Sequence, residues 1–229
     1  MKRTPENNGK LIVSVFDYTG EWAKPYIEAG YPVFLWDKKE EGDILEGSSR
    51  LISDIEEACE VYADLGMKLH GFLFAPPCDD FAVSGARWWK GKDSAPPLEE
   101  WDSWNSVDYS KAYVLICLHL VDYYREHLKF WALENPVGRI ETVIPELKPY
   151  RKLLFNPCDY GDAYTKKTIL WGEFNPSLKK TPVEPIMYEL NGKRGSFYWA
   201  KLGGKSERTK ALRSKTPSGF ARAFFEANQ

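Results

Sequence analysis

A cysteine follows two prolines directly after an apolar segment, in Ala75-Pro76-Pro77-Cys78. Because prolines stiffen the backbone, this arrangement would present the Cys78 thiol at the end of a strand. A thiolate is the strongest ordinary side-chain nucleophile near neutral pH, so Cys78 is a candidate for covalent catalysis. Most free cysteines are instead small buried apolar side chains, and that alternative stands for Cys78 taken alone.

A carboxylate occupies the corresponding place after a second apolar segment. Glu134 follows Lys129–Leu133 and precedes Asn135-Pro136. A carboxyl group half-buried at a strand end can have a raised pKa and act as an acid, whereas the alternative is a surface glutamate that begins a turn. Further along, Lys166 and Lys167 precede an apolar run, where they would place a cation beside a developing negative charge or line a solvated strand edge.

The turn after the first apolar segment has the residue types of a nucleoside site. It runs from Phe16 to Gly20, and a glycine there lets the backbone approach a ligand. Asp37 lies 17 residues after Gly20, at the end of the next apolar segment, and an acid at that place suits the two hydroxyls of a ribose. The Gly-rich cradle of a pyrophosphate is missing, which favours a ligand such as S-adenosylmethionine.

The elements that must position these groups follow from the hydrophobic pattern, since continuous apolar runs predict strands and amphipathic stretches predict helices. The pattern predicts strands at 10–16, 31–36, 50–53, 70–75, 129–133, 153–160 and 167–171, and helices at 21–29, 55–65, 110–127 and 219–227. Asn191-Gly192-Lys193 predicts a hairpin between 186–190 and 196–201, and 203–217 is predicted to be a loop.

This alternation of strands and helices predicts an α/β fold with a doubly wound, mostly parallel, Rossmann-like sheet. In such a sheet, ligands bind beyond the carboxyl ends of the strands. The candidate residues all follow predicted strands: Gly20, Asp37, Asp54, Cys78 and Glu134.

The composition is that of a soluble globular protein, with 229 residues of which 43% are hydrophobic and 28% charged. This length suits one α/β domain with a small appendage. The four cysteines show no CxxC spacing, which argues against a metal site and a disulfide framework and favours a reduced, cytoplasmic setting. No apolar run reaches the roughly 18 residues of a membrane span, so no membrane partner is expected.

Charge is distributed unevenly along the chain. Residues 148–215 carry 15 Lys and Arg against 6 Asp and Glu, while the remaining residues carry 16 against 27. A basic segment on an acidic body is the footprint expected for nucleic acid, and an ordinary solvated surface is the alternative. The candidate phosphate contacts in this segment are Lys167, Lys179, Lys180, Lys193 and Arg194.

In their order along the chain, these pieces resemble the motifs of the DNA (cytosine-5)-methyltransferases, and the short forms found in phages and prophages most of all. Pro76-Pro77-Cys78 with Phe81 resembles the catalytic Pro-Cys motif of that family, and Glu134-Asn135 its catalytic Glu-Asn pair. Lys166 and Lys167 fall where the family has a basic motif. The resemblance implies that Cys78 adds to carbon 6 of cytosine, Glu134 protonates or hydrogen-bonds ring nitrogen 3, and Lys166 or Lys167 stabilises the carbonyl at position 2.

The cofactor motifs resemble the same family. Phe16 to Gly20 is similar to the first motif, and Asp37 to the ribose-binding acid. Asp54 resembles the aspartate that contacts adenine, with Asp43 as a rival, and Arg213–Pro217 resembles the final motif, which folds back onto the cofactor site. The resemblance implies S-adenosylmethionine as cofactor, with Phe16, Gly20, Asp37, Asp54 and Pro76 in contact with it.

The family's target-recognition domain is reduced here to about one hairpin. The implied division is a catalytic and cofactor-binding core at 1–171, a reduced recognition insertion at 172–210 and a returning segment at 211–229. A partner protein would then assist recognition of DNA. The tryptophans that follow Cys78 would stack on bases or cover the sheet: Trp88, Trp89, Trp101 and Trp104.

Two other functions fit the departures from the family. Tyr18 replaces a glycine, Asp79 replaces a glutamine, and lysines replace the arginine motif. A related enzyme that modifies a free nucleotide, or transfers another group, would need no recognition domain. A non-catalytic relic that binds nucleic acid or protein would need neither an intact first motif nor the arginines.

Overall fold

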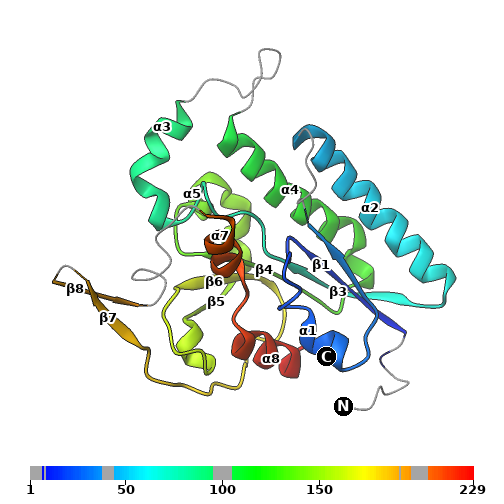
Figure 1. Cartoon of the computed structure of the whole chain (residues 1–229). Coiled ribbons are helices and arrows are strands. Elements are labelled where there is room, and N and C mark those ends of the chain that lie inside the picture. Colours follow the sequence, from blue (N-terminus) through cyan, green and yellow to red (C-terminus); the bar gives the residue numbers. More distant parts are fainter. Residues whose placement is uncertain (1–6, 8, 38–43, 95–104, 191, 197–205) are drawn as a thin grey trace.

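The computed structural model describes residues 7, 9–37, 44–94, 105–190, 192–196 and 206–229 (Figure 1). Its centre is a six-stranded sheet in the order β2-β1-β3-β4-β6-β5. The strands are β1 (Lys10–Val15), β2 (Val33–Trp36), β3 (Lys68–Phe74), β4 (Phe130–Pro136), β5 (Arg151–Phe155) and β6 (Thr168–Glu173). The first four strands in this order are parallel, whereas β6 is antiparallel to both β4 and β5.

Helices cover both faces of this sheet (Figure 1). The long helices α2 (Ile44–Asp64) and α4 (Ser106–Tyr124) pack on one face, and α1 (Lys24–Glu28) and α8 (Ser218–Ala227) on the other. A strand with both faces covered reads as a continuous apolar run, which is the pattern of β1 and β3. The predicted α/β fold with a mostly parallel sheet and flanking helices is confirmed.

Shorter elements join these layers. The short helices are α3 (Trp89–Asp93), α5 (Ile140–Val143) and α7 (Glu207–Ser214), and the 3-10 turns include η2 (Val83–Trp88) and η5 (Pro157–Tyr160). The predicted hairpin forms from β7 (Met187–Leu190) and β8 (Lys193–Ser196), and it projects from the side of the sheet (Figure 1). Its second strand begins earlier than predicted, and residues 197–201 lie outside the described part. No helix in the described ranges is long and apolar enough to cross a membrane.

Three predicted elements were wrong. Residues 50–53 belong to α2 and not to a strand, because Leu51, Ile55 and Ala58 repeat at helical spacing and are buried together. The predicted strand 153–160 ends at Phe155, where Asn156-Pro157 starts η5. The predicted loop 203–217 contains α7, whose N-cap is Ser206: its hydroxyl accepts a hydrogen bond from Thr209 N at 3.2 Å.

Candidate active site

Cys78 lies in a tight turn after β3, the strand between β1 and β4. Its carbonyl oxygen accepts hydrogen bonds from Phe81 N at 3.0 Å and Ala82 N at 2.9 Å. Phe81 is fully buried and anchors the turn on the sheet. The half-buried thiol is therefore carried by a fixed backbone at the carboxyl ends of the parallel strands, as the sequence predicts.

Glu134 lies inside β4, because that strand continues to Pro136 instead of ending at the predicted Leu133. The side chain of Glu134 is buried, and its Oε2 has no hydrogen-bond partner within the described residues. Its neighbour Asn135 is also buried, and Asn135 Nδ2 donates to Pro76 O at 3.0 Å. The Glu-Asn pair thus lies directly against the turn that carries Cys78.

Lys166 reaches the same edge because β6 runs antiparallel to β4, which places its amino end at the carboxyl end of β4. Val137 N donates to Lys167 O at 2.9 Å, which joins the chain before β6 to the chain after β4. Lys166 Nζ donates to Arg213 O at 3.1 Å. The structure therefore brings Cys78, Glu134 and Lys166 together from three distant segments.

The charges of these groups act on one another. Burial raises the pKa of the Cys78 thiol, and the cations of Lys166 and Arg213 oppose that rise. Burial also raises the pKa of Glu134, against the effect of Lys166. The buried edge thus favours a neutral thiol and a neutral carboxyl, with a cation beside both that stabilises negative charge when it develops.

The candidate cofactor residues of the first turn lie at the adjoining end of the sheet. Phe16 has a φ of 63°, and its backbone N–H donates to Trp36 O at 2.7 Å. Gly20 has a φ of 65°, and a Cβ added there would lie 3.5 Å from Leu35 Cδ1. Asp37 directly follows β2, so the turn and this acid are neighbours.

Asp17 belongs to this turn and was missed by the sequence analysis. Its Oδ2 accepts hydrogen bonds from Ala23 N and Ser14 Oγ, both at 3.1 Å. Burial raises the pKa of Asp17 to about 6, and the charge of Glu134 adds to the rise. Its position two residues after the end of β1 was the available signal, but only the folded structure shows that Asp17 is buried and close enough to Glu134 to be affected by its charge.

The other candidates for contact with the cofactor are Asp54, its rival Asp43, and Pro76. Asp54 lies on α2, and its Oδ2 accepts a hydrogen bond from Trp36 Nε1 at 2.9 Å, so it faces the end of β2 from a helix and not from a third strand. Its rival Asp43 lies outside the described residues. Pro76 is buried, and its carbonyl is occupied by Asn135.

The candidate phosphate contacts are spread over several elements. The base of the hairpin lies beside the site, because Ser196 Oγ donates to Thr165 O at 3.1 Å. Arg194 is exposed on β8, and Lys167 is exposed just before β6. Lys193 also belongs to β8, but its side chain lies outside the described part of the structure. Lys179 and Lys180 are exposed, and they follow Leu178, which packs into the core on the α8 side.

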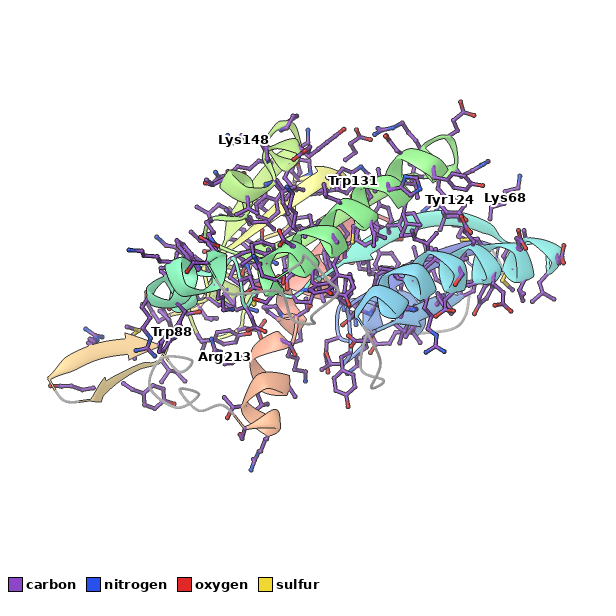
Figure 2. All side chains as sticks on the ribbon, turned by 90° about the horizontal axis from the view of Figure 1, so that it is seen from above. Lys68, Trp88, Tyr124, Trp131, Lys148 and Arg213 are labelled. Carbon is purple, nitrogen blue, oxygen red and sulfur yellow. The ribbon has the colours of Figure 1, made fainter. Side chains whose placement is uncertain are left out.

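Of the tryptophans after Cys78, the structure describes Trp88, which is exposed, and Trp89, which packs against Arg139. Trp88 is 57% exposed, with the Arg87 guanidinium 5.0 Å from the centre of its ring. Trp89 packs under Arg139, whose guanidinium lies 4.8 Å from the ring centre. Trp101 and Trp104 lie outside the described part. Trp88 and Arg213 lie toward one end of the molecule in Figure 2, and Lys68 and Tyr124 toward the opposite end.

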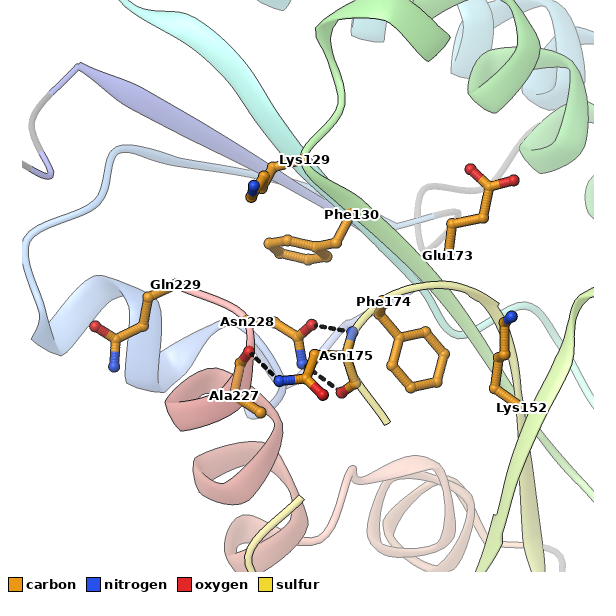
Figure 3. A pocket seen from close by; sticks show the side chains of 9 residues that line it. All are labelled: Lys129, Phe130, Lys152, Glu173, Phe174, Asn175, Ala227, Asn228 and Gln229. Atoms are coloured by element: carbon orange, nitrogen blue, oxygen red, sulfur yellow. Dashed lines mark hydrogen bonds between the residues drawn. The ribbon is translucent and has the colours of Figure 1, made fainter. Parts of the chain in front are cut away.

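A pocket of about 410 Å³ lies at the opposite edge of the sheet, at the start of β4 and the end of β6 (Figure 3). Lys129 and Lys152 line it, together with Asn175 and Asn228. The Asn228 amide bonds to the backbone N–H and carbonyl of Asn175 and to Phe224 O, and Asn175 Nδ2 donates to Ala227 O at the end of α8. Both amides are therefore occupied in holding the last residues of the chain. This pocket is separate from the candidate active site.

Comparison with known proteins gives a likeness in structure but none in sequence. No family model matches the sequence, and no curated protein matches it. Among solved structures, that of the Entamoeba histolytica methyltransferase EhMeth matches with a TM-score of 0.39 and 13% identity. The match covers 80% of this chain, which spans 62% of the length of the other.

Proposed function

We propose that this protein methylates carbon 5 of cytosine in DNA, with S-adenosylmethionine as methyl donor and Cys78 as covalent nucleophile. The observation that supports this most is the Oε2 of buried Glu134, which has no partner among the described residues and lies beside a thiol and a lysine. A buried polar atom without a partner calls for an explanation, and a bound base with a ring nitrogen supplies one.

Each residue has a separate task in this proposal. The Cys78 thiolate adds to carbon 6, which makes carbon 5 electron-rich enough to accept a methyl group. Burial raises the pKa of Glu134, which favours the protonated form that donates to ring nitrogen 3. Lys166 stabilises the negative charge on the carbonyl at position 2. The methyl transfer would leave S-adenosylhomocysteine. A water molecule then takes the carbon 5 proton while the carbon 6–sulfur bond breaks and releases Cys78 as a thiolate. A base in a duplex must first flip out.

The residues at the first turn fit the cofactor. S-adenosylmethionine would supply an electrophilic methyl group there. Gly20 adopts a left-handed conformation that favours glycine, which keeps this turn without a side chain, while Asp37 offers a carboxylate of the kind that binds ribose hydroxyls. Asp17 adds a second carboxyl group, which suits a ligand that carries positive charge.

Mass spectrometry of nucleosides from DNA incubated with protein and cofactor tests the proposed function. We expect 5-methylcytosine to appear with the wild type and not with Cys78→Ser. Free cytidine nucleotides, treated in parallel, separate the DNA enzyme from an enzyme of free nucleotides. A modified base other than 5-methylcytosine, or modification of the free nucleotide alone, would contradict the proposal.

Replacement of Asp37 by alanine is expected to weaken binding of S-adenosylmethionine about tenfold or more, because a charge-assisted hydrogen bond to the ribose is lost. Calorimetry with the cofactor measures this directly. Asp64→Ala, which removes an exposed acid at the end of α2, is the matched control and should bind as the wild type does. Equal affinity in the two variants would remove Asp37 from the cofactor site.

Affinity for DNA is expected to fall steeply with salt, since a basic segment that contacts phosphates releases counterions. Replacing Lys193 and Arg194 together, or Lys179 and Lys180, should reduce the slope of log affinity against log salt by about one for each phosphate that the variant no longer neutralises. Lys68 and Lys129, at the amino ends of β3 and β4, provide the control pair. A flat salt dependence in the wild type would favour a free-nucleotide substrate.

A further inference from the structure

The turn that carries Cys78 is joined along its length to the chain that follows Glu134. Val83 N donates to Val137 O at 3.2 Å, and Ala82 and Gly138 form an isolated antiparallel bridge. A Cβ added at Gly138 would lie 1.8 Å from Phe81 O, so only glycine permits this approach. The segment that carries the Cys78 thiol and the segment that follows Glu134 are thus in direct backbone contact.

Arg139 makes several connections in this junction. Its backbone N–H donates to Phe81 O and its Nε donates to Asp80 O, both at 2.9 Å. Its Nη1 donates to Asp93 Oδ2 at 2.8 Å, and its guanidinium covers the Trp89 ring. Only 12% of the side chain is exposed. One side chain therefore connects the Cys78 turn with both ends of α3.

Asp80 holds the turn from the other side. Its buried carboxylate accepts hydrogen bonds from Ser110 Oγ on α4 and from Lys92 Nζ on α3. Asp80 lies two residues after Cys78, so α4 fixes one side of the turn. The backbone carbonyl of Asp80 accepts from Arg139, which fixes the side that faces β4.

We propose that Arg139 is a positioning residue: its side-chain bond to the carbonyl of Asp80 holds the half-buried Cys78 thiol beside Glu134, and its contacts with Trp89 and Asp93 hold α3 against the turn that carries the thiol. The consequence for catalysis rests on the proposed function. The positioning of the thiol itself does not, because it is a property of the free protein.

Alkylation of the four cysteines by iodoacetamide, resolved peptide by peptide by mass spectrometry, tests the proposal without DNA or cofactor. In Arg139→Ala the backbone bond to Phe81 O remains, but the charge-assisted side-chain bond to Asp80 O and the contacts with α3 are lost. We expect this loss to free the turn, so that Cys78 reacts about tenfold faster near neutral pH. Its reaction profile should also shift to lower pH, since burial is what raises the pKa of this thiol. Cys117, which is fully buried in α4, should not change and reports global unfolding.

Two further variants make the test specific. Arg151→Ala, which breaks an exposed ion pair with Glu141, should leave all four rates unchanged. Arg139→Lys keeps a cation at Trp89 but cannot give the same set of directed bonds, so its Cys78 rate should fall between wild type and Arg139→Ala. An unchanged Cys78 rate and pH profile in Arg139→Ala would overturn the proposal. A joint rise of Cys78 and Cys117 would also overturn it, because the role would then be general stability.

The catalytic consequence is measured separately. If the proposed function holds, Arg139→Ala should form product about tenfold more slowly in a single turnover while its affinities for DNA and cofactor stay unchanged. A loss of affinity with no loss of rate would place Arg139 in binding and overturn the positioning role. Failure of wild type to methylate DNA would refute the proposed function and leave the alkylation result standing.

Discussion

Replacing Cys78 with serine is expected to abolish covalent capture of DNA that contains 5-fluorocytosine. Fluorine at carbon 5 cannot leave as a proton does, so an enzyme that adds its thiolate to carbon 6 and transfers a methyl group stays attached. The adduct requires the thiol, the cofactor and an accessible base together. Denaturing gel electrophoresis with labelled DNA shows it as a protein band that carries the label.

Cys158 is the matched control, because it also follows a proline, in Asn156-Pro157-Cys158. It lies in η5 after β5, and the charges around it are the carboxylates of Asp159 and Glu184. Burial and those charges raise the pKa of the Cys158 thiol. Cys78 also has carboxylates near it, those of Asp79 and Glu134, but the cations of Lys166 and Arg213 oppose their effect on its pKa. Negative neighbours disfavour a thiolate, so Cys158→Ser should form the adduct at the wild-type rate.

The residue that carries the adduct should be identified by peptide mapping, in addition to the amount of adduct formed. A labelled peptide containing Cys158 would reassign the nucleophile. A wild type that binds both DNA and cofactor but forms no adduct would contradict chemistry at carbon 5 and favour the non-catalytic alternative.

The sequence predicts the central strands well because both faces of the sheet are covered. Segments such as 10–16 and 129–133 are apolar except for Lys10, Ser14 and Lys129, and each contributes alternate side chains to the two core clusters. The same arrangement explains why candidate residues at separate strand ends lie together, since parallel strands end at one edge. Lys166 arrives there for a different reason, the reversed direction of β6.

Other features depend on contacts between distant residues and have no local pattern. Arg139 looks like any surface arginine until its partners Asp80 and Asp93 are in place. The wrong prediction of a strand at 50–53 has a different cause. Four residues are too few for the hydrophobic pattern to distinguish a strand from one turn of α2. Helix α7 is basic and has few apolar residues, so it lacks the hydrophobic pattern that predicts a helix. Its N-cap, Ser206, lies in a segment whose composition is typical of a loop.

Replacing Glu134 with glutamine is expected to slow adduct formation about a hundredfold, the usual contribution of a general acid. Glutamine has a similar shape and keeps hydrogen-bond donors, but it cannot transfer a proton. Single-turnover rates with saturating DNA and cofactor measure the effect. Glu141→Gln is the control, because Glu141 is a partly buried carboxylate engaged with Trp171 and Arg151, away from Cys78.

The Glu134→Gln substitution should also stabilise the fold, and its effect on the free energy of unfolding should depend on pH in a definite direction. Burial raises the pKa of Glu134 in the folded state, so the stability associated with its neutral form is fully present below the ordinary value of about 4.3 and is lost as pH rises through the raised pKa. Glutamine suffers no such loss. The melting temperature of Glu134→Gln relative to wild type should therefore increase with pH, by thermal unfolding at a series of pH values. A constant difference would mean that Glu134 has an ordinary pKa, and a donor at ring nitrogen 3 would then have to come from elsewhere.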